Sequence, residues 1–181
     1  MNSPVSDRVR YLSLIGPSLH TCTPEIYAFG ELLGRRLVDA GYGIACGGLF
    51  GFMEAVCKGA KASEATFRGA TIGIIPGENR SEANPYCDIV IPTGIGFSRN
   101  VLVVRSGEAV IAVGGGAGTV SEIAYAWQFG KPICGITGFG GWSEEFAGKV
   151  IDNRYSTPIA SAASPEEVLQ WLSSVFSDEG K

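Results

Sequence analysis

The sequence lacks the residues from which zinc sites and disulfide frameworks are usually built. It has a single histidine, His20, and its five cysteines are scattered without a Cys-x-x-Cys pair. Zinc ligands in proteins are mainly closely spaced histidines and cysteines, so no metal site and no catalytic metal are expected. An odd, dispersed set of cysteines is typical of a reduced protein. We therefore expect a cytoplasmic location.

The chain also has few charges and no long apolar run. Charged residues make up 18% of the sequence, the net charge is −4, and no basic stretch is present, so a nucleic acid is not expected as a partner. No apolar segment approaches the roughly 18 residues that are needed to span a bilayer, so no membrane segment is expected. The apolar run 9–15 is interrupted by Arg10 and Ser13, which predicts a strand and not the core of a signal peptide.

What the sequence does contain is enough apolar material for a sizeable core. The chain has 181 residues, of which 45% are hydrophobic, and this predicts one domain over residues 1–181 with a frayed tail from about residue 177. A chain with so few surface charges is expected to hide further apolar area between copies of itself. We therefore expect a homo-oligomer.

Apolar strands alternate with amphipathic helices along the chain. Strands are predicted at 9–15, 42–46, 70–75, 88–91, 108–113 and 132–136, and helices at 24–40, 52–63, 97–106, 119–129 and 165–176. Several such units predict an α/β fold of three layers, with a mainly parallel sheet flanked by helices. Ligands bind such sheets beyond the carboxyl ends of the strands. The Pro/Gly/Asn-rich segment 76–85 is predicted to be mobile or to face the substrate.

Three consecutive glycines stand where the strand 108–113 meets the next helix. Bare backbone at this point lets an anion approach closely, and a helix N-terminus offers unpaired N–H groups and a positive dipole end. The loop is neither a dinucleotide fingerprint, because Thr119 stands at the sixth position, nor a Walker A loop, because no Gly-Lys-Ser/Thr follows. A tight turn without a ligand would need fewer glycines. We predict a phosphate-binding loop.

Two roles fit Glu122 at the end of this segment. Thr119 and Glu122 have the spacing of a capping box, in which both side chains satisfy N–H groups at the start of a helix. The same carboxylate lies within a turn of the predicted anion site, where it could take part in catalysis or bind a ligand. Local chemistry does not decide between them.

Other residues are expected at the same edge of the sheet. Arg99 follows the glycine-containing segment 94–98, and a helix that begins near Phe97 would direct its guanidinium toward the ligand. Arginine is favoured where a phosphate needs a planar, two-pronged donor, although a solvated helix residue is the alternative. Glycine-bearing loops also follow two other predicted strands. Cys46, at the end of one of them, is expected either to face the cleft or to be a small buried residue.

The glycine segment carries a family resemblance. The residues 115–122 (GGAGTVSE), with Arg99 upstream, resemble the PGGxGTxxE motif and preceding arginine of the Lonely Guy (LOG) superfamily, long mislabelled as lysine decarboxylases. The segment 47–53 resembles the first glycine-rich stretch of that superfamily, and the match spans residues 9–137. The resemblance implies a Rossmann-like fold, a homo-oligomer, and release of the base from nucleoside monophosphates, with Arg99 and Glu122 catalytic.

The sequence departs from that motif at three positions. Gly114 replaces its proline, Ser121 replaces its penultimate acid, and Asn100 replaces the lysine that usually follows the arginine. The form GGGAGTVSEIAYAW is more similar to a branch that includes the molybdenum cofactor carrier proteins. That likeness implies a dimer or tetramer that binds a pterin bearing a phosphate and a molybdenum dithiolene.

The function expected from this resemblance is a carrier that binds and protects molybdenum cofactor (molybdopterin). The alternatives are a LOG-type phosphoribohydrolase that cleaves AMP or cytokinin nucleotides, and a nucleotide sensor without turnover. In each case the partner is a small phosphorylated ligand. The expected ligand-binding residues are Gly16, Ser18, Gly47, Gly48, Arg99, Asn100, Gly114, Gly115, Gly116, Ala117, Gly118, Thr119 and Glu122.

Overall fold

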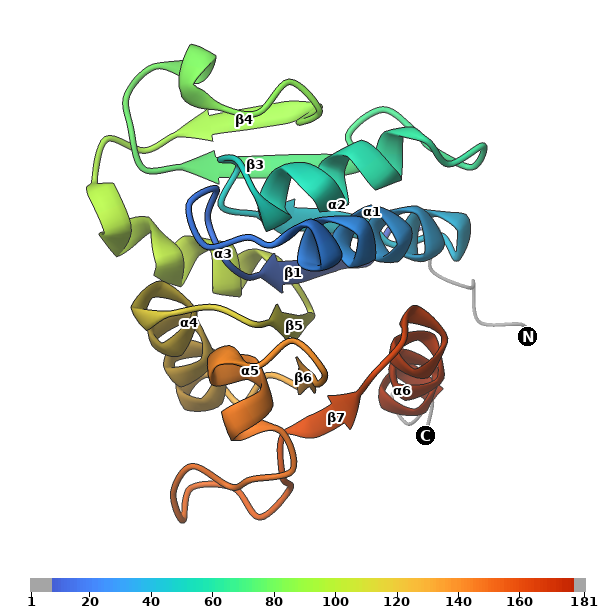
Figure 1. Ribbon diagram of the computed structural model, residues 1–181, viewed down its shortest axis with the longest axis vertical. Helices are drawn as coiled ribbons and strands as arrows, with labels where there is room; N and C mark the ends of the chain where they lie inside the picture. Colours follow the sequence, from blue (N-terminus) through green and yellow to red (C-terminus); the bar gives the residue numbers. More distant parts are fainter. Residues whose placement is uncertain (1–7, 178–181) are drawn as a thin grey trace, which may run out of the picture.

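The computed structural model describes residues 8–177, whose strands form one sheet with the order β4-β3-β2-β1-β5-β6-β7 (Figure 1). Every neighbouring pair in the sheet is parallel. The strands are β1 (Tyr11–Ile15), β2 (Gly43–Cys46), β3 (Thr71–Ile75), β4 (Ile89–Pro92), β5 (Ala109–Val113), β6 (Ile133–Ile136) and β7 (Ala160–Ala162). The helices are α1 (Pro24–Asp39), α2 (Phe52–Lys61), α3 (Asn100–Ser106), α4 (Ala117–Gln128), α5 (Gly141–Phe146) and α6 (Pro165–Ser177), with single turns η1 (Arg80–Glu82) and η2 (Gly96–Arg99).

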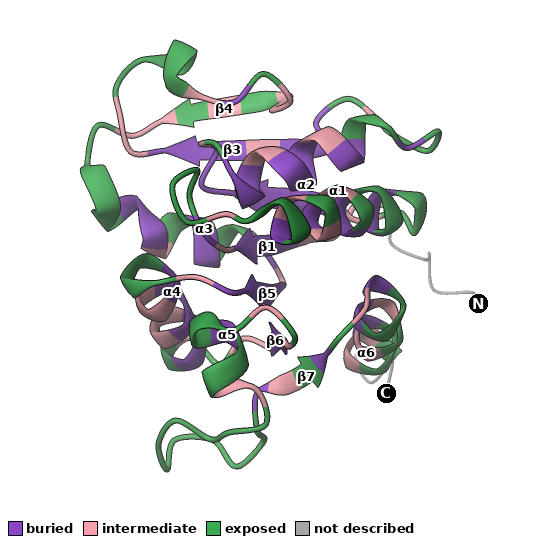
Figure 2. Ribbon diagram, in the orientation of Figure 1, coloured by how far each residue is buried: buried purple, intermediate pink, exposed green. Residues whose placement is uncertain are grey.

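Helices cover both faces of the sheet, which confirms the expected three-layer α/β fold. One apolar core joins α1, α2 and α6 to the sheet, and a second joins α3 and α4 to its other face. Strand β5 has the sequence AVIAV and is buried at every position, as a parallel strand covered on both sides should be. Figure 2 shows the buried centre of the sheet and the more exposed edge strand β4.

The order of the strands creates a switch point at β1. From β1 the chain adds β2, β3 and β4 on one side, and then returns to add β5, β6 and β7 on the other. The loops that leave β1 and β5 therefore diverge at the carboxyl edge of the sheet. A crevice at this place is the usual ligand site of open parallel sheets.

The predicted elements lie close to the observed ones, with informative exceptions. The bounds of the predicted strands agree with the observed ones to within two residues. The expected helix 97–106 begins as the single turn η2, and α4 begins at Ala117, before the expected start. The sequence reading missed α5 and β7, which have six and three residues and are too short to give a periodic signal. The tail expected to fray lies outside the described residues beyond Ser177.

No helix within residues 8–177 has both the length and the apolar character that are needed to cross a membrane.

Candidate functional site

A cavity of about 250 Å³ opens at the switch point, between the loops that follow β1 and β5. Each of five parts of the chain contributes to its wall: the loop after β1, the loop after β2, the turn η2, the start of α3 and the first two turns of α4. Ten of the thirteen residues expected from the sequence line it, namely Gly16, Ser18, Gly47, Arg99, Asn100, Gly116, Ala117, Gly118, Thr119 and Glu122.

The first turn of α4 forms one wall of this cavity. Gly116 is the N-cap residue of α4 and has no side chain to cap it, and the helix continues for twelve residues from Ala117. The first N–H groups of a helix have no acceptor within the helix. A Cβ added at Gly116 or Gly118 would meet nothing within 4 Å, so the backbone stands open to the cavity. This is the surface that an anion can approach.

Three predicted ligand residues do not line the cavity and instead support the loops around it. Gly114 and Gly115 have φ of +51° and +87°, and their carbonyls accept the N–H groups of Ser143 at 3.0 Å and Trp142 at 3.3 Å, in α5. Gly48 has φ of +71° and lies against β3, where an added Cβ would come within 2.7 Å of Ile75. The backbones of these three residues therefore face other elements of the fold, and their contact with a ligand stays a prediction.

Replacing Gly115 by alanine is expected to lower the free energy of unfolding by about 1–3 kcal/mol. Its φ of +87° disfavours a side chain, and the new Cβ would overlap the side chain of Thr119. Gly116→Ala is the matched control, because its φ of −112° suits alanine and its Cβ position is open. Urea unfolding of both variants measures the difference, and equal midpoints would contradict the role assigned to Gly115.

Arg99 enters the cavity from the end of η2 and is 5% exposed. Its Nη2 donates to the Gly47 carbonyl at 3.2 Å, its Nη1 donates to Asn100 Oδ1, and the same Nη1 lies 3.7 Å from Glu122 Oε1. Its Nε is buried and has no hydrogen-bond partner in the part of the chain that the structure describes. Burial lowers the pKa of this guanidinium, and the nearby Glu122 opposes that shift. The cavity thus contains a fixed cation with a spare donor.

Asn100 links this arginine to α4. Its Nδ2 donates to Ser121 Oγ at 3.0 Å, and Ser121 Oγ in turn donates to the Gly118 carbonyl at 2.7 Å. Asn100 is itself 5% exposed and accepts from Arg99. The chain of hydrogen bonds fixes the guanidinium relative to the open backbone of the helix. Asn100 and Ser121 are two of the positions at which the sequence departs from the LOG motif.

The capping box predicted for Thr119 and Glu122 is not formed. Because α4 begins at Ala117, Thr119 is its third residue and Glu122 its sixth, beyond the N–H groups that a capping carboxylate reaches. The helix starts early because the loop before it is held by α5 at Gly114 and Gly115. Glu122 is instead 7% exposed, and its position beside Arg99 has no explanation as a local helix cap.

Burial raises the pKa of the Glu122 carboxyl to about 8, although the neighbouring Arg99 lowers it. At neutral pH the carboxyl is therefore largely protonated, while the guanidinium keeps its charge. The cavity then has a net positive charge, which favours an anion. A neutral carboxyl can also donate a hydrogen bond or a proton to a ligand.

The stability of the wild type relative to Glu122→Gln is expected to fall as the pH rises from about 4.5 to about 8. In this range the folded protein keeps the proton of Glu122 and the unfolded chain has lost it, so unfolding is increasingly favoured. One proton gives a slope of at most about 1.4 kcal/mol per pH unit. Unfolding curves of both proteins across this range measure it, and parallel pH profiles would show that Glu122 ionises normally.

The sequence reading missed several residues of the cavity wall, chiefly Leu49, Met53 and Phe97. Phe97 is 81% exposed at the rim, and apolar side chains of this kind give no signal in the sequence. The segment 76–85, expected to face the substrate, does not line the cavity. Its Asn84 is buried and donates through Nδ2 to the carbonyls of Gly48 at 3.1 Å and Leu49 at 3.0 Å. The segment therefore holds the loop after β2 in place from behind the cavity wall.

A second cavity, of about 300 Å³, lies at the amino end of β6 and differs in character. Its wall includes Trp127, Tyr155 and Trp171. The cation in it, Lys131, already donates to the carbonyls of Arg105 and Gly107. It lies away from the switch point and from the Arg99–Glu122 pair, so the first cavity is the better candidate for an anionic ligand.

Known proteins resemble this chain over most of its length. The model of the SLOG cluster4 family matches residues 9–169. An uncharacterized protein of Archaeoglobus fulgidus is 39% identical over 115 residues, which are 64% of this chain and 73% of that protein. The solved structure of the molybdenum cofactor binding protein from Rippkaea orientalis has a TM-score of 0.80 and 32% identity to this chain. The match covers 94% of this chain and 99% of the Rippkaea orientalis chain. The molybdenum cofactor carrier protein of Chlamydomonas reinhardtii has a TM-score of 0.77 and 25% identity, with 93% and 99% covered.

Proposed function

The chain belongs to the SLOG cluster4 family, in the LOG-like branch that includes molybdenum cofactor carrier proteins, and we propose that it binds and protects molybdenum cofactor. The observation that carries the proposal is the pairing of the open backbone at Gly116 and Gly118 with the buried guanidinium of Arg99 in one cavity. Backbone N–H groups at a helix start and an arginine are the donors that a phosphate prefers.

The residues present fit the phosphate end of this cofactor. Within the described residues, the buried Nε of Arg99 has no partner and the positions beside Gly116 and Gly118 are open. The largely protonated Glu122 adds no negative charge that would repel the ligand. Phe97, exposed at the rim, offers an aromatic face to the pterin ring system. The bound cofactor itself would supply the molybdenum and its dithiolene sulfurs, and the protein would exclude water and oxidants.

The buried Arg99–Glu122 pair favours a second candidate, a phosphoribohydrolase of the LOG type. Because Glu122 is not a helix cap, its position needs another reason, and a carboxylate beside a bound sugar can stabilise positive charge at the carbon that loses the base. The raised pKa argues against a permanently charged carboxylate in the free protein. For this reason we place the carrier first.

The two functions are separated by incubation with isolated cofactor and, in parallel, with AMP. We expect native mass spectrometry to detect retained cofactor, and we expect the bound cofactor to lose its absorbance more slowly in air than free cofactor does. Release of free base and ribose phosphate from AMP, without retention of cofactor, would favour the hydrolase. Binding of AMP with neither turnover nor cofactor retention would identify a nucleotide sensor.

We also propose that the protein is a cytoplasmic homo-oligomer, a dimer or a tetramer. Ile89 and Ile91 on the edge strand β4 are 43% and 44% exposed, and Phe97 follows nearby in the chain. The five cysteines are free, as in a reducing compartment. Sedimentation velocity is expected to give a mass of two or four chains.

A further inference from the structure

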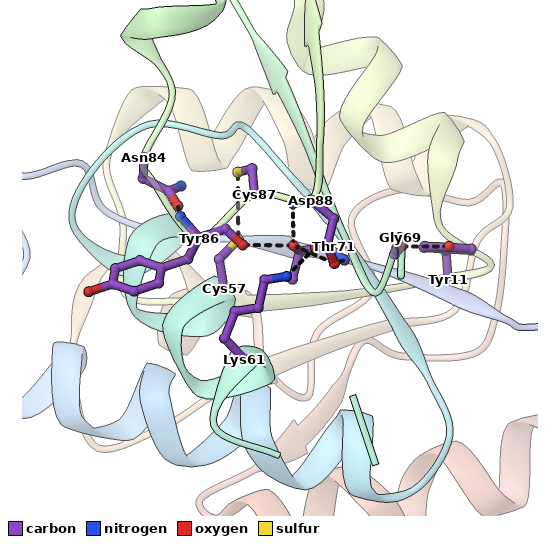
Figure 3. A network of polar contacts seen from close by, with 9 residues as sticks. All are labelled: Tyr11, Cys57, Lys61, Gly69, Thr71, Asn84, Tyr86, Cys87 and Asp88. Carbon is purple, nitrogen blue, oxygen red and sulfur yellow. Dashed lines mark hydrogen bonds and ion pairs between the residues drawn. The ribbon is translucent and has the colours of Figure 1, made fainter. Parts of the chain in front are cut away.

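Three of the five cysteines lie together behind the wall of the candidate site, although the sequence separates them widely. Sγ of Cys46 lies 3.7 Å from Sγ of Cys57, which lies 3.9 Å from Sγ of Cys87. Cys46 ends β2, Cys57 is in α2, and Cys87 precedes β4. Figure 3 shows Cys57 and Cys87 pointing toward each other. Among residues 8–177 no group of side chains is arranged to hold a metal ion, so the cluster needs another interpretation.

The cluster extends from the cavity wall toward the surface. Cys46 directly precedes Gly47, whose carbonyl accepts from Arg99, and is fully buried. Cys57 is also fully buried, whereas Cys87 is partly exposed. Cys87 is therefore the member that a small solute reaches first, and Cys57 is its immediate neighbour.

The contacts between the three thiols and their burial shift their pKa values in opposite directions. Hydrogen bonds from the thiols of Cys57 and Cys87 and from the Gly48 N–H hold the pKa of Cys46 well below its usual value, and Arg99 adds to this. Hydrogen bonds within the cluster and burial raise the pKa values of Cys57 and Cys87. Reaction at Cys87 therefore depends on its exposure and on its contact with Cys57, and not on a lowered pKa.

We propose that Cys57 and Cys87 form an oxidative modification site, at which hydrogen peroxide converts the two thiols into a reversible disulfide. The Cys87 sulfur attacks one peroxide oxygen, the O–O bond breaks, and the leaving hydroxide takes up the proton of the Cys87 thiol as water. The Cys57 sulfur then attacks the sulfenic acid at Cys87, the S–O bond breaks, and a second water forms with the Cys57 proton. Two thiols lose two electrons and peroxide gains them.

The disulfide would affect the candidate site through the segment 76–85, which holds the loop after β2. A disulfide has a sulfur–sulfur distance of about 2.05 Å, so the two atoms must approach by about 2 Å from their present 3.9 Å. Cys87 follows Asn84, whose side chain holds the carbonyls of Gly48 and Leu49. On the other side, Asp88 pairs with Lys61 of α2 and resists movement (Figure 3). The movement is therefore expected in the segment 76–85 and in the loop at Gly48 and Leu49, which lies beside the cavity.

The test is peptide mapping of the full chain after brief exposure to hydrogen peroxide, without reduction. We expect a linked pair of peptides that contain Cys57 and Cys87, about 2 Da lighter than their sum, which dithiothreitol separates. Amide exchange at Gly48 and Leu49 should change with it. Cys57→Ala should abolish the link, whereas Cys134→Ala, at a buried and isolated cysteine, should retain it.

Two outcomes would overturn the proposal. One is that Cys57 and Cys87 stay reduced while peroxide oxidises Cys22, which is also partly exposed. The other is a disulfide that joins a different pair in the wild type. Both outcomes are read without any ligand, so failure here is distinct from failure of the carrier function.

Discussion

Arg99→Met is expected to weaken the binding of a phosphorylated ligand by about a hundredfold or more, because charge-assisted hydrogen bonds contribute about 1.5–3 kcal/mol each and tenfold is about 1.4 kcal/mol. The guanidinium is the fixed cation of the cavity, and its Nε has no hydrogen-bond partner among residues 8–177. Calorimetric titration with isolated cofactor, and with AMP as a simpler phosphate probe, measures the loss.

The control for this variant is Arg105→Met, which removes an exposed arginine from the same segment of chain. The Arg105 guanidinium stacks on Phe129, with 4.0 Å to the ring centroid, and does not line the cavity. Removal of Arg99 would leave a charged Glu122 buried without its ion-pair partner. Titrations at pH 6 avoid this, because Glu122 is then protonated in the folded protein. Equal affinities of Arg99→Met and Arg105→Met would show that phosphate is bound elsewhere.

Gly118→Ala is expected to block the same ligand while it stabilises the fold. Gly118 is the second residue of α4, and an added Cβ meets nothing within 4 Å among the described residues, so alanine should raise the free energy of unfolding by up to about 1 kcal/mol. The methyl group projects into open space at the cavity wall, where the ligand would lie. We expect binding at least about tenfold weaker, as for a lost 1.4 kcal/mol.

Opposite changes in stability and binding distinguish this variant from Gly115→Ala, which is expected to damage the fold. A thermal unfolding curve and a titration of each protein are sufficient. If Gly118→Ala bound the ligand as well as the wild type does, the first turn of α4 would not contact the phosphate.

The sequence predicts the parts of the site that depend on local backbone chemistry. The glycine run after β5 predicts an open helix start without tertiary information. Its members Gly114 and Gly115 have a second use, because they have positive φ and accept hydrogen bonds from α5. The alternation of strands and helices likewise predicts the parallel sheet and the edge where ligands bind. Arg99 lies in the cavity, as its place after the segment 94–98 indicates.

The rest of the site depends on contacts between distant segments. The start of α4 is set by α5, a helix of six residues without a sequence signal, and this start decides that Glu122 is not a cap. The segment 76–85 has the composition of a mobile loop, but Asn84 ties it to Gly48 and Leu49. Cys46, Cys57 and Cys87 are in contact because the fold brings the end of β2, the helix α2 and the start of β4 together. The spacing of the three cysteines along the chain does not reveal this.

The most direct test of the proposed ligand site is a crystal structure of the protein with bound molybdenum cofactor, with molybdenum located by its anomalous scattering. We expect the phosphate within hydrogen-bonding distance of the N–H groups of Ala117, Gly118 or Thr119 and of the Arg99 guanidinium, at the carboxyl edge between β1 and β5. Cofactor bound in the cavity between Trp127 and Trp171, or a phosphate that contacts neither Arg99 nor the start of α4, would contradict it.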